Sequence, residues 1–351
     1  MLKFLKCVCY FGKFLGITPF LGNSRWLIIA SKIYALLLIA IFTLGAVLQL
    51  IYKREFYTHM IPIKVVVDIL IDLSLYSFSV VALISVTFFH DRKWKKIIKY
   101  FEEIENILTI NPTNEVPYYF AIAVMIIGIW LIVFSDVYSF YKNGNDGYIQ
   151  KFGICVWQLF GLLYYHITLF LFTKLFLIYY KNLRTDLKKQ IDIFRNSATV
   201  DIFSNVQYIW NALRTATDHF SDIFGWPLLF SFLYVSLILI SCLESTFKIN
   251  DELNVVLTRI LFVLLFLICS VIFIFMCDFV LQEAQKSFRM VVKLQEEVTT
   301  GNKEIEKLLY GFSNNFPKFS VARFFCINRS AIFGLLSNVI TFVIVILQFE
   351  G

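Results

Sequence analysis

Apolar residues are arranged in seven long runs along the chain, and polar residues are concentrated between them. Each run is long enough to cross about 30 Å of hydrocarbon as an α-helix that rises about 1.5 Å per residue. The pattern therefore predicts an all-α integral membrane protein with seven transmembrane helices. These helices are expected at residues 27–51, 65–89, 118–140, 153–179, 222–247, 256–281 and 330–349.

The composition supports a membrane protein. Of the 351 residues, 59% are hydrophobic and 16% are charged. Soluble domains are about half apolar and about a quarter charged. A water-soluble domain could not bury so much apolar surface, whereas a bilayer solvates it.

The connections between the runs differ in their content of basic residues. Most of the 32 Lys and Arg residues fall in the N-terminal segment and in the connections after the second, fourth and sixth runs. By the positive-inside rule, these parts face the cytoplasm. We therefore expect a cytoplasmic N-terminus and an extracellular C-terminus. The net charge of +7 then reflects topology, and no nucleic-acid partner is expected. The basic residues expected outside are Lys53, Arg54, Lys64, Lys142, Lys151 and Lys248.

Some of the polar connections are themselves patterned as helices. Within 91–107, 183–196 and 284–310, apolar residues recur at helical spacing between charges. The helices of the fourth, fifth and sixth spans are therefore expected to continue into the cytoplasm and to bundle as a stalk. The alternative is a set of separate helices on the lipid surface. Residues 1–22 predict a short amphipathic helix on the inner membrane surface.

Patterns of reactive or metal-binding residues are absent from the sequence. The cysteines and histidines show no metal-ligand spacing, and no nucleophile is paired with a base. We therefore expect no enzymatic activity, no metal and no cofactor.

The most specific pattern lies near the C-terminus. Residues 316–330 read Phe-Pro-Lys-Phe-Ser-Val-Ala-Arg-Phe-Phe-Cys-Ile-Asn-Arg-Ser, and residues 341–349 read Thr-Phe-Val-Ile-Val-Ile-Leu-Gln-Phe. Together they resemble the signature of the insect gustatory receptor family. In that family a Phe-rich stretch ending in Asp/Asn-Arg-Ser precedes a seventh helix with Thr-Tyr, five apolar residues and Gln-Phe. Two positions depart from it, because Arg323 stands where Gly is usual and Phe342 replaces the Tyr.

The resemblance implies a homotetrameric or heterotetrameric, non-selective cation channel gated by a small-molecule tastant, either a sugar or a bitter compound. It implies one chemoreceptor domain over residues 1–351. This domain has a cytoplasmic segment at 1–26, ligand-binding helices within 27–282, a cytoplasmic connection at 283–329 and a pore helix at 330–351. The expected location is the plasma membrane of a sensory neuron dendrite. There the chain would contact lipid, permeant cations and other gustatory receptors.

Three other classes of membrane protein are alternatives. An insect odorant receptor shares the fold, although the Gln-Phe ending favours a gustatory receptor. A G-protein-coupled receptor requires an extracellular N-terminus, which would place most of the basic residues outside the cell. A transporter is disfavoured because the chain shows no internal repeat and no matching pair of broken spans.

The last apolar run carries a stripe of polar and small residues on about a third of its circumference. Such a stripe can line water or pack closely against another helix, and the resemblance favours a pore. Near the outer end, Val345, Gln348 and Phe349 share one face. Rings of these side chains could contact or exclude hydrated ions. The candidate pore and gate residues are Thr341, Phe342, Val345, Gln348, Phe349 and Glu350.

Several charged and aromatic residues lie at similar depth in the outer halves of the predicted spans. Charged side chains in hydrocarbon are costly and often functional. Acids beside indole rings predict a polar pocket for a small hydroxylated or nitrogenous molecule. The alternative is a structural role, with Arg259 pairing with Glu244 or with an aspartate. The candidate ligand-binding residues are Asp68, Asp72, Trp130, Asp136, Trp157, Gln158, Tyr164, Tyr165, Glu244 and Arg259.

Overall fold

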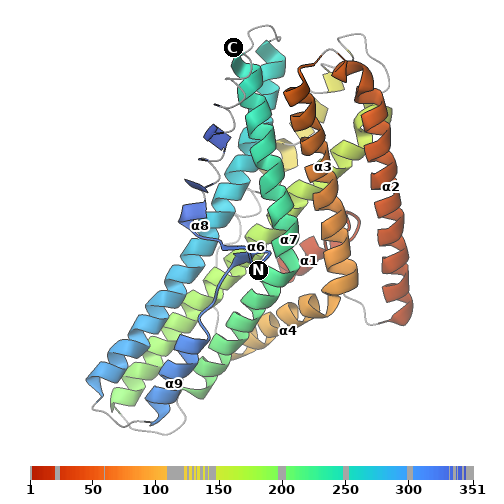
Figure 1. Ribbon diagram of the computed structural model, residues 1–351. Helices are drawn as coiled ribbons and strands as arrows, with labels where there is room; N and C mark the ends of the chain where they lie inside the picture. Colours follow the sequence, from red (N-terminus) through yellow and green to blue (C-terminus); the bar gives the residue numbers. More distant parts are fainter. Residues whose placement is uncertain are drawn as a thin grey trace.

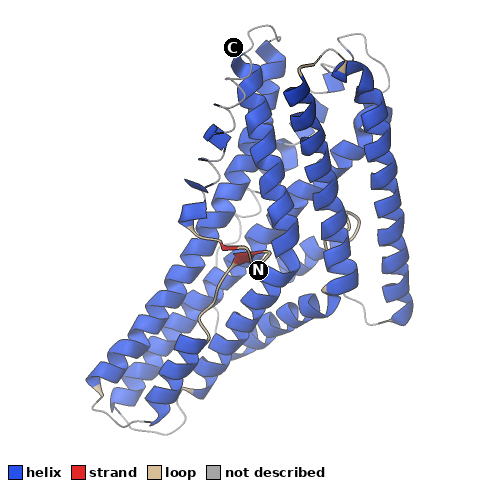
Figure 2. Cartoon of the chain, viewed as in Figure 1, coloured by secondary structure: helices blue, strands red, loops and turns tan. Residues whose placement is uncertain are grey.

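The structure is a computed structural model of the chain. It describes residues 2–19, 24–58, 60–108, 148–196, 203–247, 253–298 and 303–331. It also describes scattered residues within 122–141 and within 333–344. Helices make up almost all of the described chain (Figure 2).

Nine helical elements and one short hairpin are described (Figure 1). The hairpin strands are antiparallel, with Ser320 opposite Cys326 and Val321 opposite Phe325. The elements are α1 (Leu2–Gly12), α2 (Arg25–Tyr57), α3 (Pro62–Ile84), the π-helix η1 (Ser85–Phe89), α4 (Asp91–Ile107), α6 (Tyr148–Asn196), α7 (Ser204–Phe247), α8 (Leu253–Glu297), α9 (Lys303–Asn314), β1 (Ser320–Val321) and β2 (Phe325–Cys326).

Five of the described helices are long and apolar enough to cross a membrane. They contain the stretches Arg25–Arg54, Pro62–Phe89, Phe152–Arg195, Ser204–Leu243 and Ile260–Glu297. These correspond to the first, second, fourth, fifth and sixth predicted spans, so the all-α membrane architecture is confirmed. The predicted spans 118–140 and 330–349 are described only in part. The residues described within these two ranges are helical.

The predicted extension of the long helices is also confirmed. Helices α6, α7 and α8 run for 49, 44 and 45 residues, about twice the length that a bilayer requires. Their extended parts lie side by side with α9 at the lower left of Figure 1. This bundle is the predicted stalk. Helix α4 is a separate helix that packs against α7.

Helix α1 forms where its amphipathic pattern predicts, but other helices cover its apolar face. Leu2, Leu5 and Cys9 are buried, and α1 packs against α6. Burial raises the pKa of the Cys9 thiol to about 12, so this cysteine remains protonated. The sequence predicted lipid contact for this face. The core supplied by α6 and α4 takes the place of the lipid.

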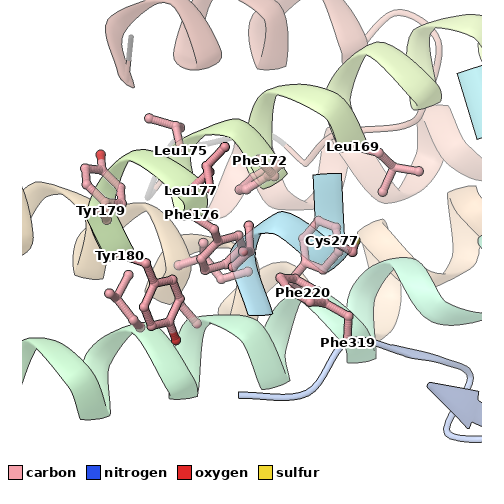
Figure 3. Close-up of a cluster of buried hydrophobic side chains, with 14 of the residues drawn as sticks. Leu169, Phe172, Leu175, Phe176, Leu177, Tyr179, Tyr180, Phe220, Cys277 and Phe319 are labelled. Atoms are coloured by element: carbon pink, nitrogen blue, oxygen red, sulfur yellow. The ribbon is translucent and has the colours of Figure 1, made fainter. Parts of the chain in front are cut away.

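An aromatic core joins α6, α7 and α8 (Figure 3). Phe176 of α6 and Phe220 of α7 meet at 5.9 Å between ring centroids. Phe319, which lies between α9 and β1, packs against both rings at 5.8 and 5.7 Å. Phe319 is only 1% exposed. The core therefore fixes the segment that leads into the last predicted span.

Candidate functional site

A small cavity opens between α2, α3 and α6; its enclosed interior has room for about one water molecule, and its empty space reaches about 240 Å³ only when the open mouth is included. Its wall is mainly apolar, and an N-terminal segment closes one side. Three of its lining residues carry a polar side-chain atom, namely Ser79, Trp157 and Gln158. The remaining lining residues are Leu15, Ile17, Phe42, Phe78, Ala82 and Gly161.

Gln158 gives this cavity its chemistry. The residue is 6% exposed, and its Nε2 atom has no hydrogen-bond partner among the described residues. A buried polar group without a partner is costly. By contrast, the Ser79 hydroxyl donates to the Leu75 carbonyl at 3.0 Å. The cavity therefore offers a free amide NH2 group, with two N–H donors, inside an apolar wall. As described it is smaller than a ligand pocket, so an apolar molecule with an acceptor oxygen would match its chemistry only after the helices around it part.

Two of the predicted ligand-binding acids lie elsewhere, in a network between α2 and α3. Lys53 Nζ donates to Asp68 Oδ2 at 2.8 Å and to Asp72 Oδ2 at 2.7 Å. The Tyr57 hydroxyl donates to Asp68 Oδ2 at 2.8 Å. Gln49 Nε2 donates to Asp72 Oδ1 at 3.1 Å. Each carboxylate thus has two donors, and neither aspartate lines the cavity.

Lys53 is a member of this network that the sequence did not identify. We expected it in the connection after the first span, whereas α2 continues to Tyr57. Its ammonium therefore lies near the C-terminal end of α2, directly opposite two carboxylates of α3. The spacing of Asp68 and Asp72 on one helical face was the available signal.

The predicted ligand-binding residues Tyr164 and Tyr165 make hydrogen bonds between helices. The Tyr165 hydroxyl donates to the Phe224 carbonyl of α7 at 2.7 Å. The Tyr164 hydroxyl donates to the Val8 carbonyl of α1. Each tyrosine ties α6 to a different helix, and neither lines the cavity.

The other predicted ligand-binding residues are placed as follows. Trp130 packs against Phe160 of α6, with ring centroids 4.9 Å apart, and is 49% exposed. Asp136 lies outside the described residues. Glu244 and Arg259 belong to α7 and α8, but their side chains are not among those described. The structure thus brings Trp157 and Gln158 together at the cavity and Asp68 and Asp72 together at Lys53.

Of the predicted pore and gate residues, Thr341 alone is described. Its hydroxyl donates to the Ser337 carbonyl at 2.9 Å, as expected one turn apart in a helix. Val339 is buried next to Ile240 of α7. The other predicted pore and gate residues, Phe342, Val345, Gln348, Phe349 and Glu350, lie outside the described residues.

The segment at 315–329, called the lead-in below, contains the hairpin that precedes the last predicted span. Ala322 and Arg323 form its turn with φ angles of 46° and 64°. This left-handed conformation favours glycine. It accounts for the Gly that is usual at this position in the family signature that the sequence resembles. Arg323 Nη2 instead donates to Asp222 Oδ1 of α7 at 2.9 Å.

Metal chemistry has no visible basis in the part of the chain that is described. There, no group of three or more His, Cys, Asp or Glu side chains could hold a metal ion. The site is therefore defined by a cavity, an ion-pair network and a docked lead-in.

Solved structures of other proteins share this architecture. None of the curated proteins compared with the chain matches it in sequence. The solved structure of the insect olfactory receptor OR5 from Machilis hrabei matches with a TM-score of 0.67 and 12% identity, covering 99% of this chain and 98% of that chain. The same receptor in complex with eugenol matches with a TM-score of 0.66 and 14% identity over the same shares. At these identities the likeness shows a shared fold.

The sequence profile described as "7tm Chemosensory receptor" matches residues 5–350. The predicted resemblance is thereby confirmed at the level of the wider family. The chain belongs to the 7tm chemosensory receptor family.

Proposed function

We propose that the protein is a gustatory receptor that acts as a ligand-gated, non-selective cation channel in the plasma membrane of a sensory neuron. The observation that supports this proposal most is the cavity between α2, α3 and α6, with the unpartnered Nε2 atom of Gln158 in its wall. In a member of the chemosensory receptor family, such a cavity would mark the place where the helices part to hold a small molecule. The protein would therefore work as a receptor and not as an enzyme.

The chemistry of the cavity narrows the ligand. A sugar presents many hydroxyl groups, each of which needs a partner when it is buried. The cavity wall offers few polar atoms, and Asp68 and Asp72 already bind Lys53. A small aromatic or aliphatic molecule with an acceptor oxygen fits this wall better. Within the tastants, this favours a bitter or aromatic compound over a sugar.

The ion pathway is proposed to run along the last helix. Four copies of residues 330–350, from this chain alone or with other gustatory receptors, would surround a central axis. Rings formed by Gln348 and Phe349 would then control hydration and closure at the outer mouth. Glu350 would add carboxylates there and raise the local concentration of cations.

The test is whole-cell recording from heterologous cells that express the chain without an added G-protein pathway. Eugenol, caffeine and sucrose serve as probes of the aromatic, bitter and sugar classes. We expect a cation current with eugenol or caffeine, and substitutions at Gln348 should shift its reversal potential. A response that requires a G protein, or a tag at the N-terminus that stains in intact cells, would refute the channel proposal.

An odorant receptor is the second candidate, because the two solved structures described above are those of an insect olfactory receptor. It predicts the same current and the same cavity. Expression in olfactory rather than gustatory neurons, together with sensitivity to volatile ligands alone, would favour it.

A further inference from the structure

The lead-in is docked on two turns of α7. The backbone N–H of Ser320 donates to the Ser221 hydroxyl at 3.2 Å. Gly225 allows the close approach, since a Cβ atom at this position would lie 2.6 Å from the Ala322 nitrogen. Figure 2 shows the hairpin strands lying across the long helices at this level.

Asp222, which lies between these two contact points, is shared between two elements. Its Oδ2 atom accepts a hydrogen bond from Lys93 Nζ of α4 at 2.7 Å. Its Oδ1 atom accepts one from Arg323 Nη2 of the lead-in at 2.9 Å. The Asp222 side chain is 17% exposed, whereas that of Arg323 is 80% exposed. One half-buried carboxylate therefore joins α4, α7 and the lead-in.

The turn that Arg323 occupies depends on external contacts. Ala322 and Arg323 both have positive φ angles, which are unfavourable for residues with a Cβ atom. Backbone strain of this kind persists where surrounding contacts hold it. The ion pair with Asp222 is such a contact.

The same stretch of α7 is tied to the helix that lines the cavity. The Ser85 hydroxyl donates to the Ile223 carbonyl, next to Asp222, at 2.8 Å. Ser85 begins η1, which continues directly from α3, and Phe78 and Ser79 of α3 line the cavity. Isolated π-helical turns are often found at functional sites. Cavity, η1, α7 and lead-in therefore form one continuous set of contacts.

We propose that Asp222 is a positioning residue that couples the corner between η1 and α4 to the lead-in. When this corner moves, Lys93 and the backbone next to Asp222 move with it, and the turn at Arg323 follows. The consequence for gating rests on the proposed function, because it requires that the helix after the lead-in lines the pore. The mechanical coupling itself does not require this.

Hydrogen exchange of the full-length protein in lipid nanodiscs tests the coupling without a ligand. The informative amides are those of Phe324 and Ile327, which bond to the Val321 and Phe319 carbonyls at 2.8 and 2.9 Å. Because partly exposed ion pairs have modest strength, we expect Asp222→Asn to raise their exchange about fivefold and Lys93→Gln about threefold. Lys318→Gln, which removes an exposed charge from the same segment, should have no effect.

A double substitution separates coupling from independent local effects. If Asp222 is the link, Lys93→Gln adds nothing in the Asp222→Asn background. The proposal is overturned if the increases in exchange rate of the two single variants multiply in the double variant. It is also overturned if Lys93→Gln exchanges at the same rate as Lys318→Gln. Arg323→Lys keeps the charge, so its exchange rates should be closer to those of the wild-type protein than the rates of Arg323→Gln are.

Current recordings with eugenol then test the consequence for gating. Asp222→Asn and Arg323→Gln should each lower the ratio of evoked to basal current about threefold at equal surface expression. If the wild-type protein gives no evoked current with any probe while exchange responds as stated, the proposed function fails and the coupling stands. A normal wild-type current with unchanged variants in both assays would leave the proposed function intact and refute the coupling.

Discussion

The Asp278 carboxylate of α8 accepts a hydrogen bond from Arg329 Nε at 2.6 Å, immediately before the last predicted span. The Arg329 guanidinium also lies 5.8 Å from the centroid of the Phe275 ring. Arg329 belongs to the Asn-Arg-Ser end of the sequence signature. This position of the signature thus fixes the start of the last helix to α8.

Removal of this contact should loosen the start of the last helix. Arg329→Gln leaves the 18% exposed Asp278 carboxylate with Gln282 as its remaining partner, at a cost of about 1 kcal/mol. Thermal unfolding in detergent, measured for Arg329→Gln, Asp278→Asn and the double variant, should give a coupling energy of that size. Additive single effects would contradict a direct pair.

The network around Lys53 should matter for folding more than for ligand sensitivity. Lys53→Met leaves two neighbouring carboxylates without their cation, at a cost of about 2 kcal/mol or more. Surface expression should fall sharply, whereas Lys53→Arg should retain it. The matched control is Lys99→Met, which breaks a more exposed pair with Glu103. A shift in the dose–response curve with normal expression would instead indicate a ligand-binding role for Asp68 and Asp72.

Gln158→Leu should separate stability from ligand response. Leu removes a buried amide whose Nε2 atom has no partner among the described residues. The free energy of unfolding should therefore stay equal or rise by about 1 kcal/mol, and the melting temperature should stay equal or rise with it. The eugenol response should weaken at least tenfold. Gln190→Leu, the same change further along α6, serves as the control. A Gln158→Leu variant with an unaltered response would remove this cavity as the ligand site.

The corner at His90 should respond to acid. Burial, and next the Lys93 ammonium, lower the pKa of His90 below its usual 6.5. Its Nδ1 atom lies 3.0 Å from the Ser85 hydroxyl. A lowered pKa means that the stability given by the neutral ring is present above about pH 6.5 and is lost as the pH falls through the folded-state value. The melting temperatures of the wild-type and His90→Gln proteins at pH 7.5 and 5 measure this loss. An equal change in melting temperature between the two pH values in both proteins would exclude it.

The turn residue should tolerate glycine better than valine. Arg323→Gly removes the conformational cost of a positive φ angle, about 1 kcal/mol. It also removes an exposed ion pair whose stabilisation is of about the same size or less. We expect a melting temperature near that of the wild-type protein. Arg323→Val keeps the strain and loses the pair, so it should melt lower. Equal destabilisation by both substitutions would show that φ strain does not govern this turn.

Much of the fold could be predicted from the sequence because helical periodicity is a local property. The expected helix at 91–107 coincides with α4, Asp91–Ile107. The end of the first span was predicted too early, because Lys53 reads as a loop residue until its partners on α3 are known. Charge alone did not reveal that α2 continues past the apolar run.

The candidate site was harder to predict because it depends on tertiary contacts. Tyr164 and Tyr165 were expected in the same ligand-binding pocket, but consecutive helical residues point about 100° apart. One accordingly bonds to α1 and the other to α7. Ile17 lines the cavity although it lies before the first span, and no sequence pattern indicates this. The signature marked Arg323 only as a departure from Gly, whereas the structure shows the turn there and the partner of Arg323, Asp222.

The length of the stalk helices has a mechanical consequence. At about 1.5 Å per residue, the 49 residues of α6 extend over about 70 Å, more than twice the hydrocarbon thickness. A rigid rod of this length acts as a lever, so a tilt of about 5° at one end displaces the other by about 6 Å. The cavity residues Trp157 and Gln158 lie near the start of this rod. A small rearrangement around a bound molecule would therefore be amplified at the far tip, where Arg195 of α6 pairs with Glu297 of α8.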